Sequence, residues 1–275
     1  MIVKNLMFDT EPMVIHANGM GADAVLAILR KMGLEYEFTD PYNVNSEIKE
    51  NWFRVIKTNK FLTEDDVKNF FKFSNEKLNS DLEIITWTDA PNKNIFELIL
   101  KAYNIPYHNL VNSNQKYQSM LKITNTLDFL KKTTAKYIFG CDAKDVFILK
   151  HPNDILKSFL TKFPNHKMLI NGELNDTPQF ITTFEHESFK HHNSPYRFVN
   201  SGVYIAEKEF LINFLIRCLE YYDSILQIGV SSHMQDQACF KVVYPEFYPS
   251  AFLDYDCEIF QTLFFVEDKF IKIYE

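Results

Sequence analysis

The chain has 275 residues, of which 46% are hydrophobic and 15% aromatic, a composition typical of a globular protein. Its 29 Lys and Arg against 36 Asp and Glu give a net charge of −7, which argues against a nucleic acid as the main partner. No apolar run approaches the roughly 20 residues of a membrane span and no leader-like segment opens the chain, so we expect a soluble, cytoplasmic protein with no membrane partner.

Strands and helices are expected to alternate along most of the chain. In the first half the expected elements are strands over 2–3 and 13–16, a helix over 22–32 that ends at Gly33, a polar linker over 40–60, a helix from Thr63 to Phe73, a strand over 82–88, a helix over 94–103 and a strand near 107–111. In the second half they are a helix over 117–132, strands over 136–141, 167–170 and 199–206, a helix over 209–226, and mixed turn and strand over 252–265. The order from 82 to 141 indicates a doubly wound α/β sheet, whose ligands bind at the carboxyl ends of the strands.

Two carboxylates stand at the end of the strand expected over 136–141. Asp142 and Asp145 follow that strand, and an apolar run resumes at Val146. Carboxylates beside buried apolar residues need a partner that neutralises them, and a divalent cation is a common one. The Asp-x-x-Asp spacing by itself favours a solvated turn. The position of the pair at the end of a core strand favours a metal site.

Ordered segments of the chain resemble one known family. The region around Asp142 and Asp145 resembles the acidic motif in the glycosyltransferase domain of the procollagen lysyl hydroxylases and their viral relatives. Further segments between about 80 and 265 are similar to that domain in the same order: Leu82–Thr88, Gln115-Lys116, Gly172–Pro178, Phe198–Val203, Asp236-Gln237 and Leu253–Gln261. Agreement of this many segments is specific.

The segment Asn5–Gly19 resembles a motif at the opposite, carboxyl-terminal end of the family's domain, whose histidine is the third protein ligand of manganese. We therefore expect one circularly permuted domain over 1–275, in which 1–33 correspond to the family's last segment. In this interpretation 34–80 form a linker and helix, and 81–275 form the nucleotide-binding core and the acceptor half. The alternative is that Asn5–Gly19 is the tail of an upstream domain. Permutation requires His16 close to Asp142 and the two chain ends close together.

The resemblance implies a GT-A-like (Rossmann-like) mixed sheet flanked by helices, and a metal-dependent glycosyltransferase. It would transfer a hexose from a UDP-sugar to a hydroxyl of a protein, a glycan or a modified nucleobase, so that a nucleic acid stays open as acceptor. Mn²⁺, with Mg²⁺ possible, suits two carboxylates and an imidazole, and acts as a Lewis acid on the departing diphosphate. The residues implied are Asp142, Asp145 and His16 for the metal, Thr86, Trp87, Thr88, Lys116, Lys144, Asn18 and Gly19 for the nucleotide, Glu173 and Asn200 for the substrate, and Asp236 for catalysis.

Several of these positions have a structural alternative. Asp236 fits a helix N-cap as well as an acceptor-side carboxylate, His16 by itself would fit a core histidine, and Glu173 and Asn200 fit turns or strand ends. The chain also departs from the family in four places: Lys144 replaces an aromatic residue, Thr177 a tryptophan, Gln235 an acid and Ala22 a lysine. These departures keep open a non-catalytic nucleotide-sugar-binding module. A nucleotidyltransferase of similar fold is the third hypothesis.

Overall fold

The computed structural model describes residues 2–18, 64–88, 94–111, 118–179, 192–264, 266 and 270–274. The helix expected over 22–32 and the linker expected over 40–60 lie outside these ranges, as do Lys116 and Gly19. Within them, no helix is long and apolar enough to cross a membrane.

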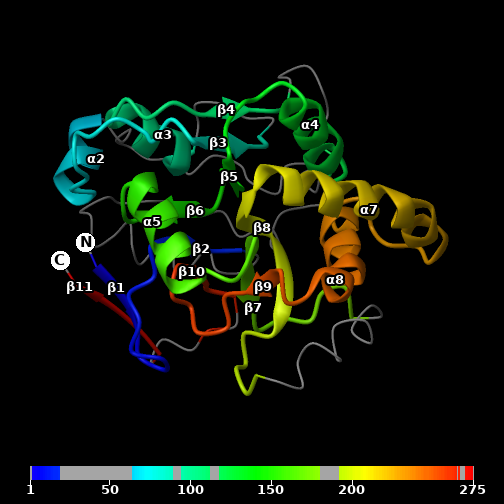
Figure 1. Ribbon diagram of the computed structural model, residues 1–275. Coiled ribbons are helices and arrows are strands. Elements are labelled where there is room, and N and C mark those ends of the chain that lie inside the picture. Colours follow the sequence, from blue (N-terminus) through cyan, green and yellow to red (C-terminus); the bar gives the residue numbers. More distant parts are fainter. Residues whose placement is uncertain are drawn as a thin grey trace, which may run out of the picture.

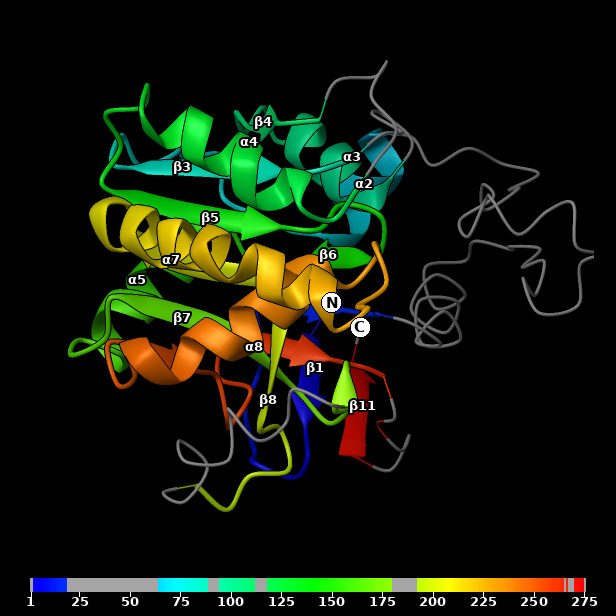
Figure 2. The ribbon, with the colours of Figure 1, turned by 90° about the vertical axis from the view of Figure 1, so that its right-hand side faces the viewer.

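A six-stranded mixed sheet forms the centre of the molecule (Figure 2). Its strands, in spatial order, are β4 (His108–Asn109), β3 (Leu82–Thr86), β5 (Tyr137–Cys141), β8 (Phe198–Glu207), β7 (Met168–Glu173) and β9 (Ala251–Leu253). β4, β3 and β5 are parallel, β8 runs antiparallel to both β5 and β7, and β9 is parallel to β7. The expected α/β class with a mixed sheet is confirmed.

Two smaller sheets carry the ends of the described chain. β2 (Val14–His16) lies between β10 (Phe260–Thr262) and β6 (Val146–Ile148), parallel to β10 and antiparallel to β6. β1 (Ile2–Asn5) pairs antiparallel with β11 (Ile271–Tyr274), so that Ile2 is in register with Tyr274. The first and last described residues are therefore neighbours (Figure 1).

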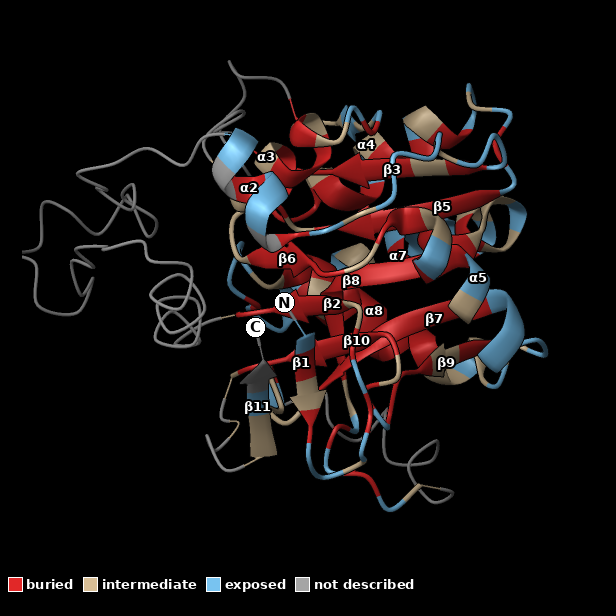
Figure 3. Ribbon diagram, turned by 90° about the vertical axis from the view of Figure 1, so that its left-hand side faces the viewer, coloured by how far each residue is buried: buried red, intermediate tan, exposed pale blue. Residues whose placement is uncertain are grey.

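Helices cover both faces of the central sheet. They are α2 (Glu64–Phe70), α3 (Ile95–Ala102), α4 (Leu121–Leu130), α5 (Pro152–Lys162), α7 (Lys208–Gln227) and α8 (Gln235–Phe247). α4, α7 and α8 lie on one face (Figure 2). α2, α3, α5 and the three-stranded sheet lie on the other (Figure 3).

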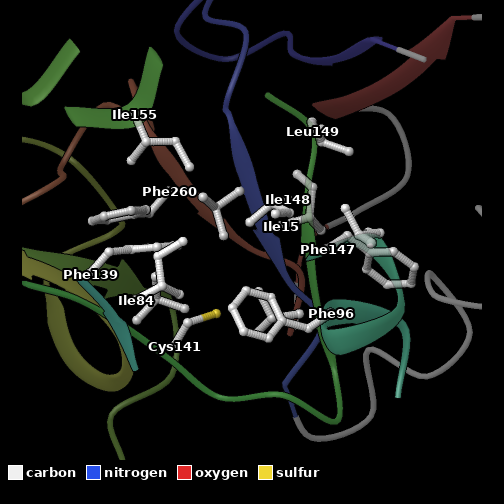
Figure 4. Close-up of a cluster of buried hydrophobic side chains, with 14 of the residues drawn as sticks. Ile15, Ile84, Phe96, Phe139, Cys141, Phe147, Ile148, Leu149, Ile155 and Phe260 are labelled. Carbon is white, nitrogen blue, oxygen red and sulfur yellow. The ribbon is translucent and has the colours of Figure 1, made fainter. Parts of the chain in front are cut away.

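The sheet has a hydrophobic core on each face because alternate residues of its strands point to opposite sides. Ile84 and Phe139 join the core of Figure 4, where they meet Ile15 of the amino-terminal segment. Ile85 and Ile138 join the core beneath α4, α7 and α8. Strands buried on both faces read as continuous apolar runs, which is why β3 and β5 could be recognised in the sequence.

Some expected boundaries were wrong. α2 ends at Phe70 instead of Phe73, because the Phe73 N–H donates to the Phe71 carbonyl at 2.9 Å and not to the preceding helical turn. The Tyr103 hydroxyl donates to the same carbonyl. α4 starts at Leu121 instead of 117, since the residues directly before it form a turn that Ser119 ties to the carbonyl of Ser232 at 2.8 Å. The strand expected near 107–111 has two residues. α5 and α8 were not predicted.

Candidate active site at the end of strand β5

Strand pairing brings the amino-terminal segment to the end of β5. His16, the last residue of β2, is in register with Val146 of β6. The Ala17 N–H donates to the Asp145 carbonyl at 2.8 Å, and His16 Nε2 lies 3.6 Å from Asp145 Oδ1. Asp142 directly follows β5. Residues from distant parts of the sequence therefore meet at one point.

Gly202 of β8 keeps the space between His16 and Asp142 open. The register between β7 and β8 shifts at Ile170/Asn171, an irregularity of the kind that redirects a strand next to a site. The Gly202 carbonyl accepts the Asp142 N–H at 2.7 Å. A Cβ at Gly202 would lie 2.3 Å from His16 Cε1 and 2.9 Å from Asp142 Oδ2. Any side chain here would displace both predicted ligands.

The ammonium of Lys122, on α4, lies between two carboxylates. Its Nζ is 2.8 Å from Asp142 Oδ1 and 3.1 Å from Asp236 Oδ2. It also lies 5.8 Å from the centre of the Trp87 ring. The side chains of Lys122 and Asp236 are only 10% and 4% exposed, so water screens this ion pair poorly. Lys122 thus connects the end of β5 to the first turn of α8.

Charges shift the pKa values of this cluster in opposite directions. Burial raises the pKa of Asp142, although the Lys122 ammonium opposes that shift. Burial acts the same way on Asp145, but the charge and hydrogen bond of His16 outweigh it and hold the pKa of Asp145 below its usual range. Burial lowers the pKa of His16, yet Asp145 and the other carboxylates leave it raised overall.

The donor types at this point fit a divalent cation. Two carboxylates and one imidazole are suitable ligands for Mn²⁺, and the absence of a side chain at Gly202 leaves room between His16 and Asp142. Within the described ranges, however, no group of three or more His, Cys, Asp or Glu side chains is arranged to hold a metal ion. In this arrangement Asp142 is paired with the ammonium of Lys122.

Glu173, the last residue of β7, is surrounded by amides. Glu173 Oε2 accepts Nδ2 of Asn18 at 2.7 Å and Nδ2 of Asn200 at 3.2 Å, and Oε1 accepts Nε2 of Gln237 at 2.7 Å. The Gln237 amide also donates to the Thr177 carbonyl. Burial raises the pKa of Glu173 to about 7, and the amide hydrogen bonds only partly offset it. The predicted substrate residues Glu173 and Asn200 are therefore in contact.

Asp236 is not an N-cap. α8 begins at Gln235 with Met234 at the cap position, so Asp236 lies in the first turn. Its Oδ2 accepts the Ser201 hydroxyl at 2.8 Å and faces Lys122 at 3.1 Å. The structural alternative for Asp236 was wrong, because its carboxylate contacts neighbouring elements instead of the N–H groups of its own helix.

The predicted nucleotide residues at the end of β3 lie in different surroundings. Trp87 is a core side chain whose indole N–H donates to Thr126 at 3.1 Å. The Thr88 N–H donates to the Asn109 side chain at 3.0 Å. Thr86 is buried, and its hydroxyl oxygen has no hydrogen-bond partner in the described part of the chain. Lys144 is half-buried on the loop between β5 and β6.

Sequence reasoning did not identify three side chains of the site: Lys122, Ser201 and Gln237. For Lys122 a signal was present. α4 buries a stripe that contains Ile123 and Leu127, and Lys122 falls on that stripe. A lysine on the buried face of a helix needs a carboxylate partner. Which carboxylate it meets depends on the packing of α4 against β5 and α8.

The comparisons with known proteins include a viral protein and a solved structure. No family model matches the chain. The uncharacterized protein R699 of Acanthamoeba polyphaga mimivirus is 24% identical over 181 residues, which cover 62% of this chain and 36% of that protein. The chain thus spans about a third of the length of this viral relative. The crystal structure of mouse xyloside xylosyltransferase 1 in its apo form matches 72% of this chain and 77% of that one, with 14% identity and a TM-score of 0.38.

The pKa of Glu173 predicts a pH-dependent stability. The folded-state pKa of about 7 exceeds the ordinary value of 4.5, so the folded state binds this proton more tightly. The resulting stabilisation is complete below pH 4.5 and is lost as the pH rises through 7. Relative to Glu173→Gln, whose amide does not titrate, the wild type should lose up to roughly 3 kcal/mol of unfolding free energy between pH 4.5 and 8.

Urea unfolding of both proteins across this pH range measures the difference. Glu64→Gln, at an exposed position of α2, is the matched control and should follow the wild type. Parallel pH profiles of wild type and Glu173→Gln would contradict the assignment.

Proposed function

We propose that this protein is a metal-dependent glycosyltransferase of GT-A-like architecture that transfers a hexose from a UDP-sugar to a hydroxyl acceptor. The observation that carries the proposal is the meeting of His16 with Asp142 and Asp145 beside Gly202. The resemblance to the lysyl hydroxylase glycosyltransferase domain implies this ligand set, although His16 comes from the opposite end of the chain. If the motif at residues 5–19 were coincidental, nothing would lead us to expect His16 beside these two acids.

The residues of the site form two groups, one for the metal ion and one for the acceptor. Asp142, Asp145 and His16 would hold Mn²⁺, which supplies Lewis-acid stabilisation of the departing diphosphate. Asp236, which contacts Ser201 and Lys122, would orient or deprotonate an acceptor hydroxyl.

Unsatisfied polar atoms and the amide group support a bound ligand. Buried polar oxygens are costly unless they find a partner. Thr86 Oγ1 and Asn18 Oδ1 lack one in the described part of the chain, and the resemblance places both residues near the nucleotide. Asn18 and Asn200 converge on Glu173, where they offer hydrogen bonds suited to a sugar.

The departures from the family pattern weigh little against catalysis. The side chain of Gln235 contacts the Tyr222 hydroxyl and the Val230 carbonyl, so its amide faces α7 and the preceding loop. The neighbouring carboxylate, Asp236, is the one that faces Lys122. Thr177 still presents its carbonyl to Gln237. These contacts favour an enzyme over the non-catalytic binding module.

We also propose that the chain is circularly permuted relative to the lysyl hydroxylase domain. Two geometric requirements of permutation are met: His16 lies beside the two acids, and Ile2 pairs with Tyr274. A side-chain hydrogen bond also joins β1 to β10, the strand that pairs with β2: Asn5 Nδ2 donates to Gln261 Oε1 at 2.6 Å.

Donor binding distinguishes the three hypotheses. UDP-sugar with Mn²⁺ should raise the midpoint of thermal unfolding, because a ligand that binds only the folded state stabilises it. The same mixture should release UDP slowly even without an acceptor. A nucleotidyltransferase would instead respond to nucleoside triphosphates, and a binding module would show the shift without turnover.

Asp142→Asn/Asp145→Asn is the test variant for this experiment, and Asp128→Asn, in an exposed ion pair on α4, is its control. UDP release should fall at least about a hundredfold in the double variant, since several kcal/mol of charge stabilisation is lost. Unchanged release in the double variant would show that these acids do not carry the reaction.

Gly202→Ala should strongly lower the rate of UDP release, because it changes the geometry of the site without removing a charged group. Its methyl group would push His16 away from Asp142, and a displacement of about 1 Å can cost roughly a hundredfold in rate. Gly229→Ala is the matched control: its φ of +76° strains alanine, but no atom lies within 4 Å of the added methyl. The control should lose about 1 kcal/mol of stability and keep its activity. Equal activity of both variants would contradict this role of Gly202.

A rearranged chain tests the permutation. A protein that starts at residue 34 and carries residues 1–33 after residue 275 should fold and keep its UDP release, because β1 and β11 are adjacent. Circular dichroism measures the fold and the UDP-release assay measures the activity. A rearranged chain whose new ends lie in the middle of α7 serves as the unfavourable comparison. Loss of the fold in the rearranged chain alone would count against the permutation.

A further inference from the structure

Lys122 forms an ion pair with Asp142, one of the three predicted metal ligands. Its Nζ lies 2.8 Å from Oδ1 and 2.9 Å from Oδ2 of Asp142, so the ammonium faces both carboxylate oxygens. In contrast, Asp145 and His16 contact each other and keep 3.6 Å between Oδ1 and Nε2. One of the three predicted ligands is thus bound to an internal cation.

Asp236 is the second carboxylate that contacts the Lys122 ammonium. Asp236 Oδ2 is 3.1 Å away and is held in place by the Ser201 hydroxyl at 2.8 Å. The space beside the lysine stem, between Trp87 and Phe240, has no room for a water molecule. An ammonium that moves away from Asp142 therefore does not find a water molecule in this space, whereas the carboxylate of Asp236 is already within contact distance.

We propose that Lys122 is an exchangeable counter-ion that competes with the divalent cation for Asp142. In the free protein, Lys122 neutralises Asp142. This inference rests on the proposed metal-dependent function. A cation at Asp142 requires the ammonium to give up that carboxylate, and two positive charges near one carboxylate repel each other. Asp236 keeps the displaced ammonium paired.

The competition couples the cation to the anionic part of the donor. A diphosphate offers oxygen atoms to the ammonium that Asp142 releases, so the positive charge of Lys122 stays compensated. The cation therefore binds weakly to the free protein and more strongly when the diphosphate is present. Lys122 weakens the binding of a metal to the carboxylates when no donor is present, and in this sense it is a positioning residue.

Binding of Mn²⁺ alone tests the proposal without any turnover. We expect Lys122→Met to bind Mn²⁺ at least about tenfold more tightly than the wild type, as measured by electron paramagnetic resonance of free Mn²⁺, because the competing charge is gone. Lys122→Arg keeps the charge and should bind like the wild type. Lys131→Met, on the same helix but in an exposed pair with Asp128, is the matched control and should not change the affinity.

The outcomes separate the two proposals. Equal or weaker Mn²⁺ binding by Lys122→Met, while the wild type binds Mn²⁺ through Asp142 and Asp145, overturns the counter-ion role and leaves the proposed function intact. Absence of Mn²⁺ binding in every variant, with and without UDP, overturns both. If Lys122→Met does not fold, as judged by circular dichroism, Lys122→Gln takes its place with the same expected result.

Discussion

The neutralisation of buried carboxylates at the end of β5 is the constraint on which this site depends. Asp142 and Asp236 reach the same point from two different elements, and the side chain of Asp236 is only 4% exposed. The side chain of Asp142 is 24% exposed, whereas a carboxylate as buried as that of Asp236 is costly unless a cation compensates it. The Lys122 ammonium does so for both, and it can do so only while α4, β5 and the first turn of α8 keep their relative positions. Loss of Lys122 would leave two uncompensated charges.

The amino-terminal segment satisfies the same constraint for Asp145. β2 is inserted between β10 and β6, which fixes His16 beside Asp145 through backbone pairing on both sides. An imidazole placed by a strand has little freedom to move, so its orientation is set before any ligand arrives. The apolar neighbours of β2, including Ile15, anchor it in the core of Figure 4. The position of His16 in the site therefore depends on the packing of β2 in the core.

The sequence predicted the parts of this fold whose signals are local. β3 and β5 are largely continuous apolar runs. α3 is preceded by its N-cap Asn94, whose side chain accepts the Glu97 N–H. α8 was missed because most of its residues are buried, so it has no polar face to give a helical period, and it contains Pro245. The pairing of Lys122 with Asp236 could not be predicted either, since it depends on how α4 and α8 pack.

The surroundings of the carboxylates separate their protonation states. His16 holds the pKa of Asp145 below its usual range, so this group stays anionic and suited to a cation. Among the described residues, the hydrogen-bond partners of Glu173 are neutral amides, and burial raises its pKa to about 7. Carboxylates whose pKa values are driven apart take different roles in one site. If the proposed function holds, Asp145 would serve the metal, while Glu173 could carry a proton near neutral pH beside the amides of Asn18, Asn200 and Gln237.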